Sequence, residues 1–388
     1  MVATVFAEIP NIGIKEEWVW KTDIITTIKG DESRSSIRPR PRIKNTASFG
    51  PLTQAERISF YNTLSRNAKI INDVPLYQYS TPITQDASAT DTRVYFNPSP
   101  IHLASGGQII LINPRTGAFH QSNVAVAETD GAQLSSALTQ DIDTGWLACL
   151  SMSAKIDDAS FRINQITGEI DVTFLSWVDP AVQRSDTAAS LTTLDGLTVL
   201  EREFLAENTE DFSFNSEVID FDAGIRREYS QWEWVTIKSE KQYRIQRVLD
   251  TTDFDYWRLF FDTVKGAQKA FLISTQMKDM TLQSALTQGG TTMSINEDID
   301  ELLHAHEQWK HFEIKYTDGT FSRHTISNST GAGPVTVTFA PALPSDPKVA
   351  NVERISHLLK SRMSDTITFE HGALVTIVSI ETTTTDSG

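Results

Sequence analysis

The sequence has very little cysteine, no long apolar run and no excess of basic residues, and each lack limits what the protein can do. Its 388 residues include one cysteine, Cys149, which excludes an intrachain disulfide and any site built from several cysteines. Because Cys149 stands in an apolar stretch, we expect it to be a small buried residue. No apolar run approaches the roughly 20 residues of a membrane span, and the N-terminus lacks the order of a signal peptide. We expect a soluble protein made in the cytosol, with no membrane partner.

Basic residues are also scarce. Lys and Arg number 34 against 50 Asp and Glu, which gives a net charge of -16. Binding to nucleic acid needs clustered Lys and Arg side chains that neutralise phosphates, so the composition argues against specific DNA binding. The one basic cluster, from Arg34 to Lys44, is local.

The sequence contains no complete zinc-protease motif. The segment from His306 to His311 resembles such a helix superficially, but the motif needs histidines four residues apart so that both point at one metal. Five residues apart, the two rings lie roughly 140° apart around a helix. His311 is also predicted to begin a strand, so we expect no metal site here.

Other catalytic patterns are equally weak. Two pairs of aspartates are of the kind that glycosidases use, Asp141 with Asp143 and Asp298 with Asp300, yet any acidic chain offers such pairs. Neither pair of adjacent glycines is followed by the residues of a phosphate-binding loop, and no G-x-S-x-G elbow is present. We predict a protein that is not an enzyme and that has no catalytic, cofactor-binding or metal-binding residues.

What the sequence does contain is an aromatic helix that leads into a buried strand. Apolar residues recur at helical spacing between 253 and 266, Gly266 suits a helix end, and the run from Ala270 to Ile273 predicts a strand. An alternating stretch that opens at Trp232 and Trp234 precedes this helix. The unit therefore reads as strands, helix and strand.

A similar order occurs near the N-terminus, where Trp18 and Trp20 open a β-branched stretch. Thr53 and Glu56 form a capping box that begins a helix, for which we expect an apolar face of Ile58, Tyr61 and Leu64. Residues from Lys69 to Tyr77 would form the closing strand. The two matches indicate an internal duplication, although a chance recurrence of W-x-W explains them as well.

Together these patterns predict a mainly β protein with short helices, of the α+β class. The predicted parts are a first unit at 1–80, a loop at 80–92, a β-sandwich or barrel domain inserted at 93–180, a connecting segment at 181–220, a second unit with a C-terminal β domain at 221–380, and a polar tail at 381–388. Within the connecting segment, helical spacing runs from Leu197 to Phe214, and a second capping box at Ser294 to Glu297 predicts a short helix after it. The clearest hairpin turns at Asp318-Gly319.

Three stretches resemble tail-tip proteins of long-tailed bacteriophages, the distal tail and baseplate hub group. The first is Trp20 to Ile25 with Gly30 to Arg42, the second is Phe260 to Leu272, and the third is Arg354 to His371. Together they cover about a third of the chain. The family pattern has a Gly-Arg pair after the aromatic residues, where this chain has Lys265-Gly266.

The resemblance implies a structural virion protein with two tail-tube-like units. Such a protein forms a ring at the end of the tail tube, joins it to the baseplate, tip or fibres, and leaves a DNA ejection channel through which DNA passes without being bound specifically. It implies assembly in the host cytoplasm with copies of itself, with the tail tube protein and with other baseplate or fibre proteins. Two units per chain favour a homotrimer with six similar domains; the alternative is a homohexamer.

Two other functions stay open at this point. Four aromatic residues of the middle region could form a carbohydrate-binding module for the host surface: Trp146, Phe161, Phe174 and Trp177. Alternatively, one of the carboxylate pairs could belong to a tail-associated cell-wall hydrolase.

The basic cluster supplies the candidate residues for a subunit interface. Arg34, Arg38, Arg40 and Arg42 fall within nine residues, and prolines between them hold the backbone extended. We expect this arm not to pack within its own acidic chain but to pair with carboxylates of a neighbouring subunit.

Overall fold

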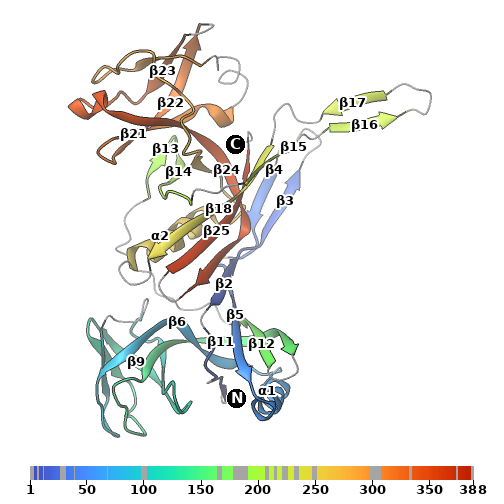
Figure 1. Cartoon of the computed structure of the whole chain (residues 1–388), viewed down its shortest axis with the longest axis vertical. Helices are drawn as coiled ribbons and strands as arrows, with labels where there is room; N and C mark the ends of the chain where they lie inside the picture. The colour runs from blue at the N-terminus through green and yellow to red at the C-terminus, as the bar shows by residue number, and fades with distance from the viewer. Residues whose placement is uncertain are drawn as a thin grey trace.

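The computed structural model confirms a mainly β protein, with 57% strand, 11% helix, two helices in its described part and a large antiparallel sheet. It describes residues 4–6, 8–11, 13–26, 32–38, 40–67, 69–97, 103–163, 168–177, 191–205, 209–213, 216–220, 226–230, 236–246, 251–297, 307–331, 334–372 and 375–385. Hydrogen bonds connect 21 of the described strands into one continuous sheet, and two hairpins stand apart from it. The molecule is elongated, with the N-terminus at one end and a group of strands from the C-terminal third of the chain at the other (Figure 1).

The first twelve strands and one helix form the N-terminal set. They are β1 (Thr4–Val5), β2 (Ile14–Val19), β3 (Thr22–Thr26), β4 (Glu32–Ser36), β5 (Arg42–Leu52), α1 (Gln54–Asn67), β6 (Asn72–Gln85), β7 (Arg93–Phe96), β8 (Gln108–Ile112), β9 (Phe119–Glu128), β10 (Gly131–Leu134), β11 (Leu147–Ile163) and β12 (Gly168–Ser176). Their hydrogen-bonded order is β1-β6-β11-β12-β5-β2, in which only β1 and β6 are parallel.

The remaining strands form the C-terminal set, entered through β13 (Thr193–Leu194). They are β14 (Leu197–Leu200), β15 (Thr209–Ser213), β16 (Ser216–Asp220), β17 (Arg226–Ser230), β18 (Thr236–Gln246), α2 (Thr251–Val264), β19 (Phe271–Ser274), β20 (Thr292–Ile295), η1 (Glu307–Trp309), β21 (His311–Tyr316), β22 (Phe321–Thr330), β23 (Val335–Ala340), η2 (Pro347–Ala350), β24 (Val352–His371) and β25 (Val375–Thr384). Their order is β14-β19-β24-β25-β18-β15, in which only β14 and β19 are parallel.

Each of these pairings in one set thus has its counterpart in the other, with strand numbers that differ by 13, whereas β6–β7 and β13–β14 have no counterpart among the described strands. The match extends to the separate hairpins, β3–β4 and β16–β17, and to the smaller group of strands in each half, paired β7-β10-β9-β8-β11 and β20-β23-β22-β21-β24. Helices α1 and α2 have 14 residues each and precede matching strands. The two halves of the chain therefore share one strand topology.

The start of α1 and the end of α2 are as the sequence predicts. The backbone N–H of Thr53 donates to the Glu56 carboxylate at 2.7 Å, which completes the capping box of α1. Helix α2 ends at Val264, and Gly266 follows with a φ of +61°. Neither described helix is long and apolar enough to cross a membrane.

The predicted apolar face of α1 is wrong. Phe60 is its buried aromatic residue, whereas Ile58 is 53% and Tyr61 39% exposed. Helix α2 instead buries most of its aromatic side chains in the main core, including Phe254, Trp257, Phe260 and Phe261. The hydrophobic face of α1 thus points partly at solvent, while that of α2 is covered.

Three further predictions need correction. In the segment from Leu197 to Phe214, predicted to be helical, the described residues 197–205 and 209–213 form no helix and contribute β14 and β15, which join neighbouring strands of the sheet. The predicted loop at 80–92 is strand as far as Gln85, and the predicted tail at 381–388 is strand as far as Thr384, with Thr382 and Thr384 buried. Both segments are polar, and for that reason the sequence predicted a loop and a tail. They are strands because their backbones pair with neighbouring strands.

Other predictions are confirmed or fall outside the description. The hairpins at β8–β9, β11–β12 and β21–β22 are present as expected. Trp232 and Trp234, and the predicted helix after Glu297, lie outside the described residues. The domain boundaries stay predictions, although β11 and β12 of the predicted inserted domain pair with β6 and β5.

Gly266 provides a test of how tightly the end of α2 is packed. A Cβ at this position would lie 2.9 Å from the Trp20 Cβ and 3.2 Å from the Asp365 Cα. We expect Gly266→Ala to lower the free energy of unfolding by about 2–4 kcal/mol, from left-handed strain plus overpacking. Gly319→Ala is the matched control, because Gly319 has a φ of +81° but nothing within 4 Å. Equal losses in urea denaturation would show that only the backbone conformation matters.

Candidate functional site

The two strand sets meet where β2 inserts between β5 and β24. Strand β2 pairs antiparallel with β5 on one edge and with β24 on the other, from Ile14 opposite His371 to Val19 opposite Thr366. The N-terminal and C-terminal sets are thereby joined through main-chain hydrogen bonds as well as side chains. We call this contact the β2–β24 junction.

A buried carboxylate lies at the centre of the junction. Glu16 on β2 is 1% exposed and accepts hydrogen bonds from Gln78 Nε2 at 3.1 Å and the Tyr79 hydroxyl at 2.7 Å, both on β6. His371 Nε2 on β24 lies 3.2 Å from the same carboxylate, and Trp18 Nε1 donates to it. The hydrogen-bond partners of the carboxylate thus come from β6, from β24 and from the next residue on the same inward face of β2.

Aromatic side chains enclose this polar cluster. The Trp18 ring lies 5.7 Å from Phe369 and 6.4 Å from Phe261, and the Arg258 guanidinium lies 4.9 Å above the Trp18 ring. Phe254 of α2 stacks on His371 at 5.9 Å. Because α2 covers the cluster, water is kept from its charges, and the charges must satisfy one another.

The electrostatics follow from this arrangement. Burial alone would raise the pKa of Glu16, but the hydrogen bond and charge of His371, with the charge of Arg258, more than offset it and lower the pKa to about 2. Burial, with the neighbouring Glu16 carboxylate, raises the pKa of Tyr79 well above its usual value. Glu16 is therefore a permanent anion at neutral pH, which suits a structural pairing and not proton transfer near pH 7.

A second polar contact ties the base of the β3–β4 hairpin to the C-terminal set. The Asp365 carboxylate accepts from the Thr22 N–H at 2.8 Å, the Thr22 hydroxyl at 2.6 Å and the Ala267 N–H at 3.2 Å. Arg34 on β4 donates to the Ala267 carbonyl at 3.0 Å. The junction therefore continues from β2 into the hairpin.

The four predicted interface arginines are not in one environment. Arg34 binds within the chain, contrary to the expectation of an arm that does not pack internally. Arg38 is half-buried, whereas Arg40 and Arg42 are exposed. The structure therefore leaves two of the four fully available to a neighbouring subunit, and the interface role stays a prediction.

The weak catalytic candidates gain no support from their surroundings. His311 begins β21, and its Nδ1 lies 3.0 Å from the Thr325 hydroxyl, while His306 lies outside the described residues. Asp141 accepts from the Ala89 N–H at 2.7 Å, as a loop contact. Among the described residues no group of His, Cys, Asp and Glu is arranged to hold a metal ion. Asp298 and Asp300 are not described.

The aromatic residues suggested for carbohydrate binding are mostly part of the core. Trp146 is 5% and Phe174 2% exposed, and Phe161 stacks on Tyr61 at 4.2 Å. Trp177 is 55% exposed, with Lys155 Nζ 3.7 Å from its ring. These four side chains therefore do not form a common platform for a sugar.

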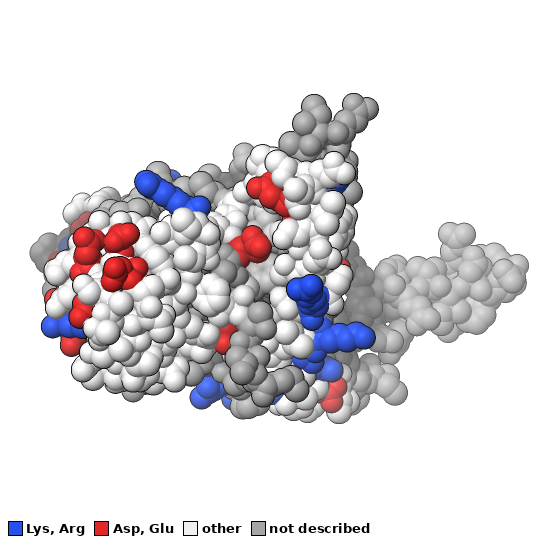
Figure 2. All heavy atoms as spheres, turned by 90° about the horizontal axis from the view of Figure 1, so that it is seen from below, with Lys and Arg blue, Asp and Glu red and all other residues white. Residues whose placement is uncertain are grey.

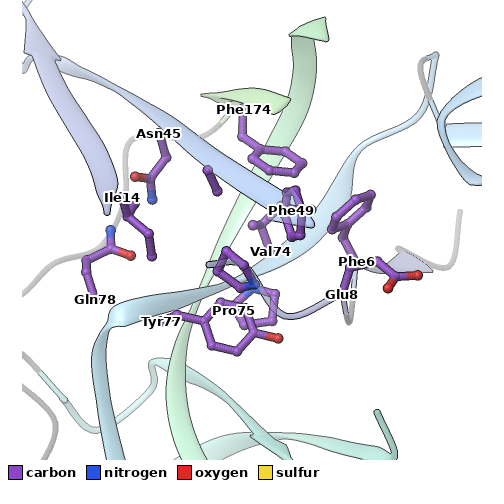
Figure 3. A pocket seen from close by; sticks show the side chains of 12 residues that line it. Phe6, Glu8, Ile14, Asn45, Phe49, Val74, Pro75, Tyr77, Gln78 and Phe174 are labelled. Carbon is purple, nitrogen blue, oxygen red and sulfur yellow. The ribbon is translucent and has the colours of Figure 1, made fainter. Parts of the chain in front are cut away.

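Pockets and surface charge add little to the choice of site. Figure 3 shows a small pocket in the N-terminal core toward which Phe6, Phe49 and Phe174 converge, with Phe6 and Phe174 centroids 5.1 Å apart. It is core packing rather than a ligand site. On the face seen in Figure 2 both signs of charge occur, with acidic side chains gathered toward one end.

Sequence reasoning missed the Glu16 cluster. Glu16 and His371 are 355 positions apart, so no local spacing could join them. The available signal was the alternation of β2, in which Glu16 falls on the same face as Ile14 and Trp18 and so is an acid on an inward-facing side. Such a residue indicates a buried partner.

Comparisons with known proteins give no further guide. No protein-family model matches the chain, and no curated protein is significantly similar to it in sequence.

Glu16→Gln tests the junction. The lowered pKa of Glu16 contributes stability that is present above pH 4.5 and is lost as the pH falls toward 2. We expect the variant to lose about 3–5 kcal/mol at pH 7, because the buried Arg258 guanidinium is left without the carboxylate that offsets its charge, and to lose less further stability on acidification. Glu17→Gln is the control, since its partner Lys15 is on the surface. Thermal unfolding at pH 7 and pH 3 measures both; parallel pH curves for wild type and Glu16→Gln would contradict the assignment.

Proposed function

We propose that this protein is a structural component of a bacteriophage tail tip, of the distal tail or baseplate hub kind. It forms a ring around the DNA channel and connects the tail tube to the tip or fibres. The observation that carries the proposal is the repeated strand topology, because a chain with two like units joined edge to edge supplies two consecutive segments of such a ring. In this reading the two strand sets are the tail-tube-like units, and β7–β10, within the predicted inserted domain at 93–180, corresponds to β20–β23 of the other unit.

The repeat also bears on stoichiometry. Three chains with two equivalent units each place six units around one axis, which adapts a sixfold tube to a threefold tip. A homohexamer in which one unit per chain lines the ring is the alternative. The homotrimer is favoured because both halves share the complete pairing order and not one strand or helix alone.

A non-enzymatic role agrees with the chemistry of the buried groups. The carboxylate whose pKa is lowered most, Glu16, is 1% exposed and accepts hydrogen bonds from Gln78 and Tyr79, which suits a structural pairing. Net charge of -16 suits a channel through which DNA slides, since acidic lumen residues repel phosphate over a Debye length of about 8 Å.

The role in virions can be tested directly. We expect mass spectrometry of purified particles to detect the protein at a few copies per particle, because one ring needs only three or six chains. Particles purified from infected cells should retain it through a density gradient. Detection in lysates alone, and never in particles, would contradict the proposal.

The exposed arginines give a second test. Arg40→Gln with Arg42→Gln removes two exposed cations, and we expect an unchanged monomer that assembles less well at moderate salt, because forks to carboxylates of a neighbouring subunit are lost. Arg34 is kept because it binds Ala267 in its own chain. Arg115→Gln with Lys278→Gln is the control of equal charge on other exposed positions. Equal assembly of both double variants would remove these arginines from the interface.

A further inference from the structure

Strand β2 of the junction corresponds to β15 in the C-terminal set. Among the described residues, β15 has a neighbouring strand on only one of its two edges. Strand β15 pairs with β18 just as β2 pairs with β5, and the matching register places Phe212 where Trp18 stands. The equivalence is supported by the partners of the two residues, Ile43 and Ile237, which are both buried. Yet Trp18 is 5% exposed and Phe212 is 62% exposed. The position that carries the buried tryptophan of the junction thus carries an exposed phenylalanine in the C-terminal set.

The receiving strand of the junction has a counterpart as well. In β24 the stretch that accepts β2 includes Phe369, which lies opposite Val378, and Val378 lies opposite Tyr243. In β11 the same succession is Phe161, Ile170 and Phe49. Strand β6 pairs with β11 only as far as Ala154, so within the described chain the stretch from Lys155 to Ile163 has no strand on that edge.

An apolar patch lies beside this open stretch of β11. At the junction Trp18 contacts Phe369, Phe261 and Arg258, whose counterparts by strand register and helix position are Phe161, Leu64 and Tyr61. Tyr61 and Ile58 are exposed, and Phe161 and Leu64 are partly so. This patch corresponds to the residues that cover Trp18 at the junction. No strand of the described chain lies over it.

We infer that β15 of one chain pairs antiparallel with β11 of a second copy and so repeats the β2–β24 junction between subunits. The inference rests on the proposed ring-forming role and identifies the edges that close the ring. The internal junction fixes the register, so that the following residues lie opposite each other: Thr209 and Arg162, Glu210 and Phe161, Asp211 and Ser160, Phe212 and Ala159, Ser213 and Asp158. Phe212 then packs against the patch of Tyr61, Leu64 and Phe161.

The partner that fits these two open edges is a second copy of the same chain. Among the described strands, β15 and the last stretch of β11 lie at opposite ends of the paired sheets, each with an open edge, so addition of chains is head to tail. The same two types of strand already bind each other once in every chain, which shows that their backbones are complementary. A heterologous contact of this kind closes into a ring when the rotation per unit divides a full turn.

Cysteine pairs test the register. In Asp211→Cys with Ser160→Cys, the two thiols of neighbouring subunits are directly opposite, within the Cα range that a disulfide spans. We expect oxidation to give a ladder of covalent oligomers that ends at the trimer, or at the hexamer if six chains close the ring. Glu17→Cys with Thr368→Cys is the matched control: the equivalent internal pair should oxidise within one chain and leave a monomer. The native Cys149 is buried and is retained.

Phe212→Ser tests the packing. We expect the folded monomer to persist and self-association, measured by sedimentation, to weaken at least about tenfold, as for loss of a central aromatic contact. Phe119→Ser removes another exposed phenylalanine, at 43% exposure on β9, and should change nothing.

The outcomes separate this inference from the proposed function. The pairing is overturned if the wild-type protein oligomerises but the Asp211→Cys with Ser160→Cys variant forms no intermolecular disulfide. It is also overturned if the wild-type protein stays monomeric at its highest soluble concentration. Presence in virions reports only on the proposed function. Absence from virions with a full cross-linked ladder would leave the pairing correct and the tail assignment wrong.

Discussion

The pairing of β2 with β24 is the contact on which the arrangement of the two halves depends, and one carboxylate fixes its register. Ile14, Glu16 and Trp18 face the core from β2, whereas Lys15 is exposed and Glu17 is partly so. A slip of one residue would turn Lys15 and Glu17 inward, away from their mutual ion pair, and would take Glu16 from His371. Because an unpaired buried carboxylate is costly, the cluster allows one register only.

The length of β24 is what lets one strand hold so much together. Its 20 residues pair with β21 and then β25 along one edge, and with β19 and then β2 along the other. Strand β11 has the same plan in 17 residues, with β8 and β12 on one edge and β6 on the other, but its last stretch stays open. The difference between the halves is therefore one absent neighbour and not a different fold.

Local signals in the sequence predicted the elements, and long-range pairing explains what they missed. The Thr53–Glu56 box and the Asp318-Gly319 turn act within a few residues, so the helix start and the hairpin could be placed. The face of α1 was misjudged because the spacing of Ile58 and Tyr61 indicates an apolar surface but not whether the same chain covers it. The W-x-W recurrence also misled: the structural counterpart of Trp18 is Phe212, because β15 and not the stretch before β18 takes the place of β2.

The charged residues at the β2–β24 junction differ from those at the open edge of β15, because the junction is buried and the edge is exposed. Inside the chain the contact is permanent, so it can include the buried Glu16 carboxylate, hydrogen-bonded to His371 and offset by the Arg258 guanidinium, without these groups facing water unpaired. At the open edge Glu210 takes the position of Glu16, but its partner Lys241 comes from the neighbouring strand of its own set, 3.5 Å away. Beside it Asp211 adds a second acid to the edge. Charged residues on an open strand discourage indiscriminate pairing, and they leave the backbone groups available to a partner that fits. In the proposed pairing, an edge of this composition discourages association until it meets the complementary edge of another chain.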